Sequence, residues 1–337
     1  MAIMRRIGKI VLVILLSLVF FLLLLFKSDI PQEELLSKYS YPESHFIEID
    51  GVTLHVRLVG SGEPVILLHG SFSSLHTWDE WQREMSPYFL TISVDLPGHG
   101  LTGPDPLQRY TIGDYSQFVL RLSEKLNINK FHLAGNSIGG AVALKIADTR
   151  PDKVLSLNLI DAAGSPQIQP RQLDSDSTST KSSPLIFDLI KNPVFSKVLL
   201  KCTPKFLFTK NIQEVYGDPE KVHEKTVDRY FDLMLREGNR QATLERFALP
   251  RDYVKEFSRI TMPVLIQWGD QDQWIPISNA MEFKKVIPDA HLVVFEGAGH
   301  VPMEEIPTES VAEYLSFLGV EIRKDYLQQP KFVTYAD

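Results

Sequence analysis

The chain has 337 residues and a formal net charge of −7, and 44% of its residues are hydrophobic. Beyond residue 27 it carries 31 basic against 42 acidic residues, a balance that argues against a nucleic-acid-binding surface, which needs clustered positive charge. Its single cysteine, Cys202, excludes an intramolecular disulfide and a cysteine metal cluster.

An apolar segment lies close to the N-terminus. Residues 10–26 are apolar apart from one serine and would extend about 26 Å as a helix, close to the ~30 Å hydrocarbon core of a bilayer. No Ala-x-Ala cleavage site follows, and three basic residues precede the run: Arg5, Arg6 and Lys9. The sequence therefore predicts a transmembrane signal anchor over 1–27, with a cytoplasmic N-terminus and the folded part on the extracytoplasmic side. A cleaved signal peptide and a buried core helix are the alternatives.

The folded part begins near residue 45, after a polar stalk over 28–44. Short apolar runs then alternate with stretches of helical spacing, which is typical of a mostly parallel sheet flanked by helices. The predicted strands are 46–50, 53–59, 64–69, 90–95, 131–135, 154–160, 263–268 and 292–295, and the clearest helices are 111–126 and 138–149.

Residues 165–260 interrupt this alternation. The polar run 174–183 comes first, and apolar patches without a clear buried strand follow it. We expect a helical insertion over an α/β core made of 45–164 and 261–320, with a C-terminal tail over 321–337. A separate small domain with no role in the site is the alternative.

The segment Gly135-Asn-Ser137-Ile-Gly139 lies between a predicted strand and a predicted helix. This context gives a G-x-S-x-G match its meaning, because a tight turn exposes the serine hydroxyl at the carboxyl edge of the sheet. The free N–H groups of the following helix point at an anion formed above the serine. Ser137 is therefore the predicted nucleophile.

A serine nucleophile needs a base and an orienting carboxylate. His300 follows the last predicted strand in a glycine-rich loop and is the predicted base. Asp272, a few residues past the preceding strand, is the predicted acid, while Asp270 and Asp161 remain alternatives. The order Ser137, Asp272, His300 is the order of nucleophile, acid and base in this architecture.

The segment 69–72, His-Gly-Ser-Phe, follows an early strand and predicts an oxyanion loop. The expected donors are the backbone amides of Ser71 and Ile138, with Phe72 possible for the first. We expect Phe72 and Asn136 to contact the substrate. His69, His99 and Asp95 are interpreted as structural, and no histidine pair has the spacing of a metal site. Neither a metal nor a cofactor is expected.

Taken together, HGSF at 69–72, DLPGHG at 95–100, GNSIGG at 135–140, WGDQDQWIP at 268–276 and GAGHVPMEEIP at 297–307 resemble the α/β-hydrolase superfamily across roughly residues 45–320. The resemblance implies a serine hydrolase with a Ser-Asp-His triad, and a cap over 165–260 that forms the substrate pocket. Serine at 137 departs from the haloalkane dehalogenase and epoxide hydrolase branches, which use aspartate there. The GNSIGG turn at 135–140, called the elbow below, is similar to that of carbon–carbon bond hydrolases of ring-cleavage dienoates. Ser71 to Ser74 and Val301 depart from the pattern of those enzymes.

These observations predict an esterase- or lipase-like carboxylic-ester hydrolase that acts on a small hydrophobic ester. The first alternative is carbon–carbon bond hydrolysis of a diketone acid, which a basic pocket residue would favour: Arg171, Arg229 or Arg246. The second is a non-catalytic, membrane-tethered binding protein, which the complete set of triad and oxyanion elements disfavours.

Overall fold

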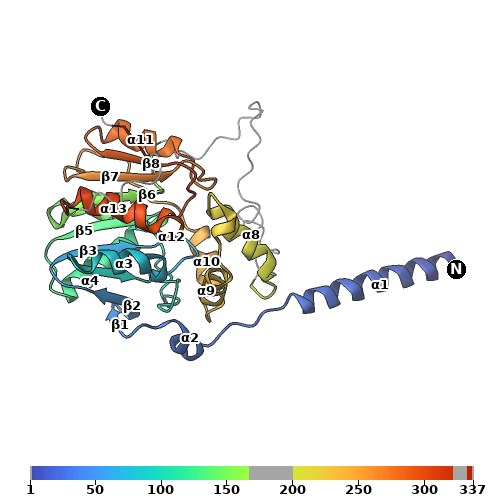
Figure 1. Ribbon diagram of the computed structural model, residues 1–337. Helices are drawn as coiled ribbons and strands as arrows, with labels where there is room; N and C mark the ends of the chain where they lie inside the picture. The colour runs from blue at the N-terminus through green and yellow to red at the C-terminus, as the bar shows by residue number, and fades with distance from the viewer. Residues whose placement is uncertain (1, 167–199, 322–331, 336–337) are drawn as a thin grey trace.

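The computed structural model describes residues 2–166, 200–321 and 332–335. Within these residues one sheet runs through the body of the molecule, with helices on both sides (Figure 1). Its strands follow the order β1-β2-β4-β3-β5-β6-β7-β8-β9. Their bounds are β1 Ser44–Ile49, β2 Val52–Val59, β3 Glu63–Leu68, β4 Phe89–Val94, β5 Phe131–Asn136, β6 Val154–Ile160, β7 Val264–Gly269, β8 His291–Phe295 and β9 Phe332–Tyr335.

The middle of the sheet is parallel and its two sides are antiparallel. Strands β4, β3, β5, β6, β7 and β8 pair in parallel, whereas β1 with β2, β2 with β4 and β8 with β9 are antiparallel. The predicted α/β fold with a mostly parallel central sheet is thus confirmed. Because parallel strands end at one edge, the loops that follow β3, β5, β6, β7 and β8 meet there.

Side chains along β3 alternate between two cores, one on each face of the sheet. Val65 and Leu67 join one core, and Ile66 and Leu68 join the other. A strand covered on both faces reads as a continuous apolar run, which is why the sequence reveals it.

Helices α4, α5 and α11 cover one face, while α3 and α13 cover the other. The helix bounds outside the insertion are α1 Ala2–Leu24, α2 Gln32–Tyr39, η1 Leu75–Trp78, α3 Asp79–Met85, α4 Ile112–Lys125, α5 Ile138–Thr149, η2 Pro151–Lys153, α11 Ser278–Val286, α12 Pro302–Glu305 and α13 Pro307–Phe317.

Two short elements lie in segments that the sequence had left without structure. Helix α2 occupies part of the 28–44 segment, where Leu35 is buried against Leu101 and Leu233. Strand β9 lies in the 321–337 segment and pairs with β8. Neither element has a long apolar run, so periodicity gave no signal for it.

The described part of the 165–260 insertion is helical. Helices α8 (Lys205–Val215), α9 (Glu224–Met234) and α10 (Asn239–Ala248), with the short η3 (Pro219–Lys221), lie together beside the sheet (Figure 1). Helices α8 and α9 contribute to the same core as α3 and α13, through Phe208, Ile212, Tyr230 and Phe231, whereas Ala242 of α10 belongs to the core on the other face. Residues 167–199, which include the polar run 174–183 and Arg171, lie outside the described residues.

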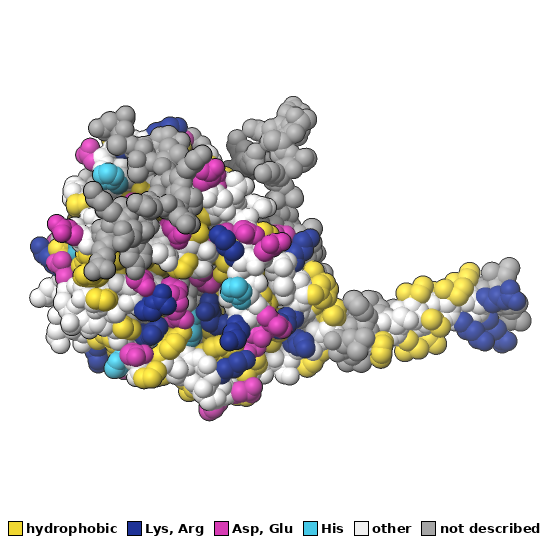
Figure 2. All heavy atoms as spheres, in the orientation of Figure 1, with side chains coloured by type: hydrophobic (Ala, Val, Ile, Leu, Met, Phe, Trp, Pro, Cys, Tyr) yellow, Lys and Arg dark blue, Asp and Glu magenta, His cyan; other side chains and the backbone are white. Residues whose placement is uncertain are grey.

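Helix α1 projects away from the body (Figure 1). Figure 2 shows hydrophobic side chains along it and basic side chains at its tip. In the part of the chain that the structure describes, no helix combines the length and the apolarity needed to cross a bilayer. The transmembrane anchor predicted over 1–27 therefore finds no support in the structure.

Candidate active site

Ser137 occupies the turn between β5 and α5. Its backbone has φ 54° and ψ −119°, a conformation that non-glycine residues rarely adopt. The turn is tight enough to require its glycines: a Cβ at Gly139 would lie 2.3 Å from the carbonyl oxygen of Leu68, and one at Gly135 would lie 2.2 Å from that of Gly139. The sequence motif is therefore a steric requirement of a turn that presents the Ser137 side chain at the start of a helix.

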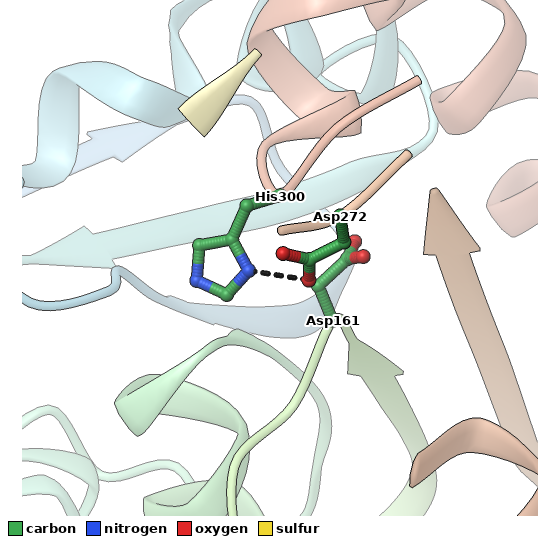
Figure 3. Close-up of side chains that lie close together, drawn as sticks. All are labelled: Asp161, Asp272 and His300. Carbon is green, nitrogen blue, oxygen red and sulfur yellow. Dashed lines mark hydrogen bonds and ion pairs between the residues drawn. The ribbon is translucent and has the colours of Figure 1, made fainter. Parts of the chain in front are cut away.

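His300 and Asp272 are joined by a hydrogen bond. The Nδ1 atom of His300 lies 2.7 Å from Oδ2 of Asp272, and both side chains are buried. The other carboxylate oxygen accepts the backbone N–H groups of Trp274 and Ile275 at 2.8 and 3.0 Å, which fixes the carboxylate. In Figure 3 the second ring nitrogen of His300 points away from the carboxylates. This arrangement orients Nε2 as the nitrogen that can take a proton.

Of the two alternative acids, Asp270 faces away from His300, because its Oδ1 accepts the N–H of Gly297 at 2.7 Å. Asp161, which follows β6, is fully buried beside Asp272 (Figure 3). Its Oδ1 accepts the N–H of Gly269 at 3.0 Å. Burial, followed by repulsion from the Asp272 carboxylate, raises the pKa of Asp161 well above its usual value. The uncharged form of Asp161 is therefore favoured beside Asp272.

Asp161, Asp272 and His300 each have one nitrogen or oxygen atom of a kind that could bind a metal ion, and these three atoms all lie within 4.8 Å of one another. The short Nδ1–Oδ2 bond between His300 and Asp272, together with the raised pKa of Asp161, fits a hydrogen-bonded acid–base cluster.

The loop after β3 packs directly on the Ser137 turn. A Cβ at Gly70 would lie 2.7 Å from Oδ1 of Asn136 and 3.1 Å from Cβ of Ser137. His69 holds the loop: its Nδ1 lies 2.8 Å from the Gly70 carbonyl oxygen, and its Nε2 accepts the Leu96 N–H at 3.0 Å. Burial lowers the pKa of His69, so the ring is neutral and acts as a tether.

The predicted oxyanion and substrate residues lie around Ser137. Ser71, Phe72 and Asn136 line one pocket beside it, and Ser71 and Ile138 line a second. The amide of Asn136 donates to the carbonyl oxygens of Ile160 and His300, at 3.2 and 2.8 Å. Asn136 thus ties the His300 loop to the elbow while its surface lines the pocket.

Glu305 is a buried residue of the site to which the sequence analysis gave no role. Its carboxylate accepts three backbone N–H groups, from Gly217, Asp218 and Gly299, at 2.9, 2.8 and 2.7 Å. The backbone N–H of His300 also donates to the carbonyl oxygen of Val215, at 2.7 Å. The His300 loop is therefore bound to the end of helix α8, so the insertion helps to position the imidazole.

Two pockets meet at the elbow. One has apolar walls from the insertion, including Leu207, Phe208, Ile212 and Met234. The other, larger pocket, called the polar pocket below, has a mixed lining in which Tyr110, Arg246 and Tyr253 stand beside apolar residues. Five residues line both pockets: Ser71, Ser137, Leu244, Trp274 and His300. A reacting carbonyl between Ser137 and His300 would have an apolar compartment on one side and a polar one on the other.

A family model described as alpha/beta hydrolase fold matches residues 63–307. The chain belongs to the α/β-hydrolase family. The resemblance of its motifs to this family is confirmed, and the protein is a hydrolase enzyme.

Three curated relatives of this α/β-hydrolase differ in activity. It is 30% identical over 262 residues to the dihydrolipoyllysine-residue acetyltransferase component of an acetoin cleaving system from Pseudomonas putida, covering 76% of this chain and 64% of that protein. It is 28% identical over 270 residues to Lipase 1 from Psychrobacter immobilis, covering 77% of this chain and 78% of the lipase. It is 26% identical over 264 residues to a 2-hydroxy-6-oxononadienedioate/2-hydroxy-6-oxononatrienedioate hydrolase from Pseudomonas sp., covering 75% of this chain and 87% of that hydrolase.

Among solved structures, the crystal structure of a membrane phospholipase A superimposes on this α/β-hydrolase with a TM-score of 0.68 at 23% identity. The match covers 96% of this chain and 98% of the other. At this identity the likeness bears on the fold alone.

Proposed function

We propose that this α/β-hydrolase is a carboxylic-ester hydrolase that works through an acyl-enzyme on Ser137. The observation that carries the proposal is the junction of the two pockets, where Ser137 and His300 share both linings and Asp272 is hydrogen-bonded to His300. Nucleophile, base and orienting acid are the three groups that acyl transfer to a hydroxyl requires.

In the proposed reaction the Ser137 hydroxyl oxygen attacks the ester carbonyl carbon, and its proton passes to Nε2 of His300. The resulting oxyanion accepts hydrogen bonds from the backbone amides of Ser71 and Ile138, each worth about 3–4 kcal/mol of barrier in enzymes of this kind. The tetrahedral intermediate expels the alcohol, which takes the proton from His300. Water then attacks the acyl-enzyme by the same route, releasing the carboxylic acid and restoring Ser137.

The apolar pocket supports a hydrophobic acyl chain. Its walls from helices α8, α9 and α10 are mainly aliphatic and aromatic, and the lipase from Psychrobacter immobilis is among the relatives. Each buried methylene contributes about 0.8 kcal/mol, which corresponds to roughly a fourfold change in an equilibrium or rate constant.

A series of p-nitrophenyl esters assayed with the full-length protein tests this function. We expect kcat/KM to rise roughly fourfold per methylene from acetate upward, and to level off when the pocket is full. Absorbance of released nitrophenolate measures the rate. Absence of turnover across the whole series would contradict the ester assignment.

Carbon–carbon bond hydrolysis is the second candidate function. The relationship to the dienedioate hydrolase from Pseudomonas sp. and the presence of Arg246 in the polar pocket both favour it. A ring-cleavage dienoate assayed beside the ester series separates the two functions. Cleavage of the dienoate without ester turnover would move the assignment to this second candidate.

For localisation, we propose attachment to a membrane through the N-terminal segment, with the catalytic domain on the extracytoplasmic side. The support comes from the sequence, which has the apolar run 10–26 with basic residues before it. Protease added to intact cells is expected to degrade the catalytic domain. Protection in intact cells combined with cleavage after lysis would refute this topology.

A further inference from the structure

Arg246, in helix α10, is a buried cation in the polar pocket. Its side chain is only 8% exposed and lines that pocket together with Ser71, Ser137 and His300. One guanidinium nitrogen, Nη1, donates to the hydroxyl oxygen of Ser71 at 3.1 Å, and the guanidinium carbon lies 4.4 Å from the ring centre of Phe247. The remaining nitrogens, Nε and Nη2, have no hydrogen-bond partner among the described residues.

No carboxylate balances this charge in the described lining of the pocket. The charged side chains there are Arg246 and Arg251, and the only acid–base side chain besides tyrosines is His300. Burial lowers the pKa of Arg246 and the nearby Arg251 lowers it further, while Tyr115 and Tyr253 oppose this. Two other arginines of the insertion differ: Arg240 is paired with Asp29 at 2.6 Å, and Arg229 with Glu304 at 3.1 Å.

An uncompensated buried charge is costly, and proteins retain one mainly where it meets an opposite charge. A planar guanidinium with free N–H groups matches the oxygens of a carboxylate or a phosphate. The contact from Nη1 to Ser71 places the guanidinium beside the loop that carries a proposed oxyanion donor. An anion held by Arg246 would therefore lie within the same pocket as the reacting carbonyl, on the side opposite the apolar compartment.

We propose that Arg246 is the anion-binding residue of an alcohol-side subsite, so that the preferred substrates are hydrophobic acyl esters whose alcohol part carries a phosphate or a carboxylate. This inference rests on the ester hydrolase function proposed above. It assigns the acyl chain to the apolar pocket and the anionic alcohol to the polar pocket, with the ester carbonyl where the two meet.

Three soluble substrates with one acyl chain test the subsite: 1-octanoylglycerol, 1-octanoylglycerol 3-phosphate, and the octanoyl ester of glycerate. In the full-length protein we expect kcat/KM for at least one anionic ester to exceed that for the neutral ester by about 10- to 100-fold, the usual range for hydrogen bonds to a charged group. The anion that gives the larger ratio identifies phosphate or carboxylate as the ligand. Equal rates for all three esters would overturn the proposal.

Arg246→Met keeps most of the side-chain volume and removes the charge. We expect the anionic-to-neutral ratio to fall to near one, whereas Arg246→Lys should retain an intermediate ratio because it keeps a charge without the planar fork. Using a ratio cancels any effect of the lost Ser71 contact on catalysis itself. Arg121→Met is the matched control: this arginine lies on α4, is mostly exposed and pairs with Asp50 at the surface, so the ratio should not change. A ratio that persists in Arg246→Met would overturn the proposal.

A binding measurement covers the case in which the variants do not fold. At matched ionic strength, glycerol 3-phosphate or glycerate should raise the Tm of the wild-type protein, while glycerol should not. No shift with either anion, together with equal ester rates, would remove the subsite but leave the hydrolase function standing. Failure of all three esters and of the p-nitrophenyl series would instead remove the ester hydrolase function.

Discussion

Replacing Ser137 by alanine is expected to lower kcat for ester hydrolysis by about 10⁶-fold, the order seen when a triad nucleophile is deleted. The loss follows from the geometry of the turn. The strained backbone at Ser137 positions its side chain at the junction of the two pockets and at the start of α5. A fluorophosphonate probe should label the wild-type protein and should not label Ser137→Ala.

Ser37→Ala provides the control for this experiment, because Ser37 is an exposed residue of α2 whose hydroxyl bonds only its own helix, at the carbonyl oxygen of Glu34. Both labelling and hydrolysis should match the wild type in that variant. Labelling that survives in Ser137→Ala would mean that another residue is the nucleophile.

The sheet and the elbow could be predicted because each has a strong local cause. The central strands are covered on both faces, so apolar runs such as the one through β3 stand out from the surrounding polar sequence. The glycines around Ser137 are imposed by backbone atoms less than 3 Å from where a Cβ would lie. Causes of this kind act over a few residues and therefore leave a readable pattern.

The partners of buried charges could not be predicted in the same way. Glu305 stands in a segment whose pattern suggests an ordinary polar surface, yet it accepts N–H groups from Gly217 and Asp218, which are distant in sequence, and from Gly299 in the nearby His300 loop. Arg246 was one of three candidate basic residues, and only the packing of α10 against the elbow distinguishes it from the ion-paired Arg229. Such contacts depend on how distant segments meet, which periodicity does not encode.

The acid that bonds His300 could not be settled from the sequence either, for the same reason. Asp161, Asp270 and Asp272 all follow strands whose carboxyl ends lie at one edge of the sheet, so the sequence left them open. In the structure Asp272 bonds His300, Asp270 bonds the Gly297 backbone, and Asp161 packs behind Asp272. Mutation can test this division of roles.

Asp272→Asn should lower kcat by about 10⁴-fold, because an amide in place of the carboxylate favours the wrong tautomer of His300 and leaves its imidazolium without a counter-charge. The amide would also have to present its oxygen to the N–H groups of Trp274 and Ile275, which now donate to Oδ1. The amide nitrogen would then donate to Nδ1 of His300, which places the ring proton on Nε2. With a proton already on Nε2, the ring cannot accept the proton of Ser137 there. Ester hydrolysis and the rate of fluorophosphonate labelling should both fall.

Asp161→Asn is the matched variant, and we expect it to retain activity within about tenfold. Burial and the Asp272 carboxylate raise the pKa of Asp161 well above its usual value, which favours the uncharged carboxyl group, and a neutral amide of similar shape mimics that form. Its oxygen can still accept the Gly269 N–H. If Asp161→Asn lost several orders of magnitude in kcat while Asp272→Asn remained active, the acid would have to be reassigned to the end of β6. The paired measurement works because both residues are buried aspartates at adjacent positions, and of the two Asp272 is the one that bonds His300.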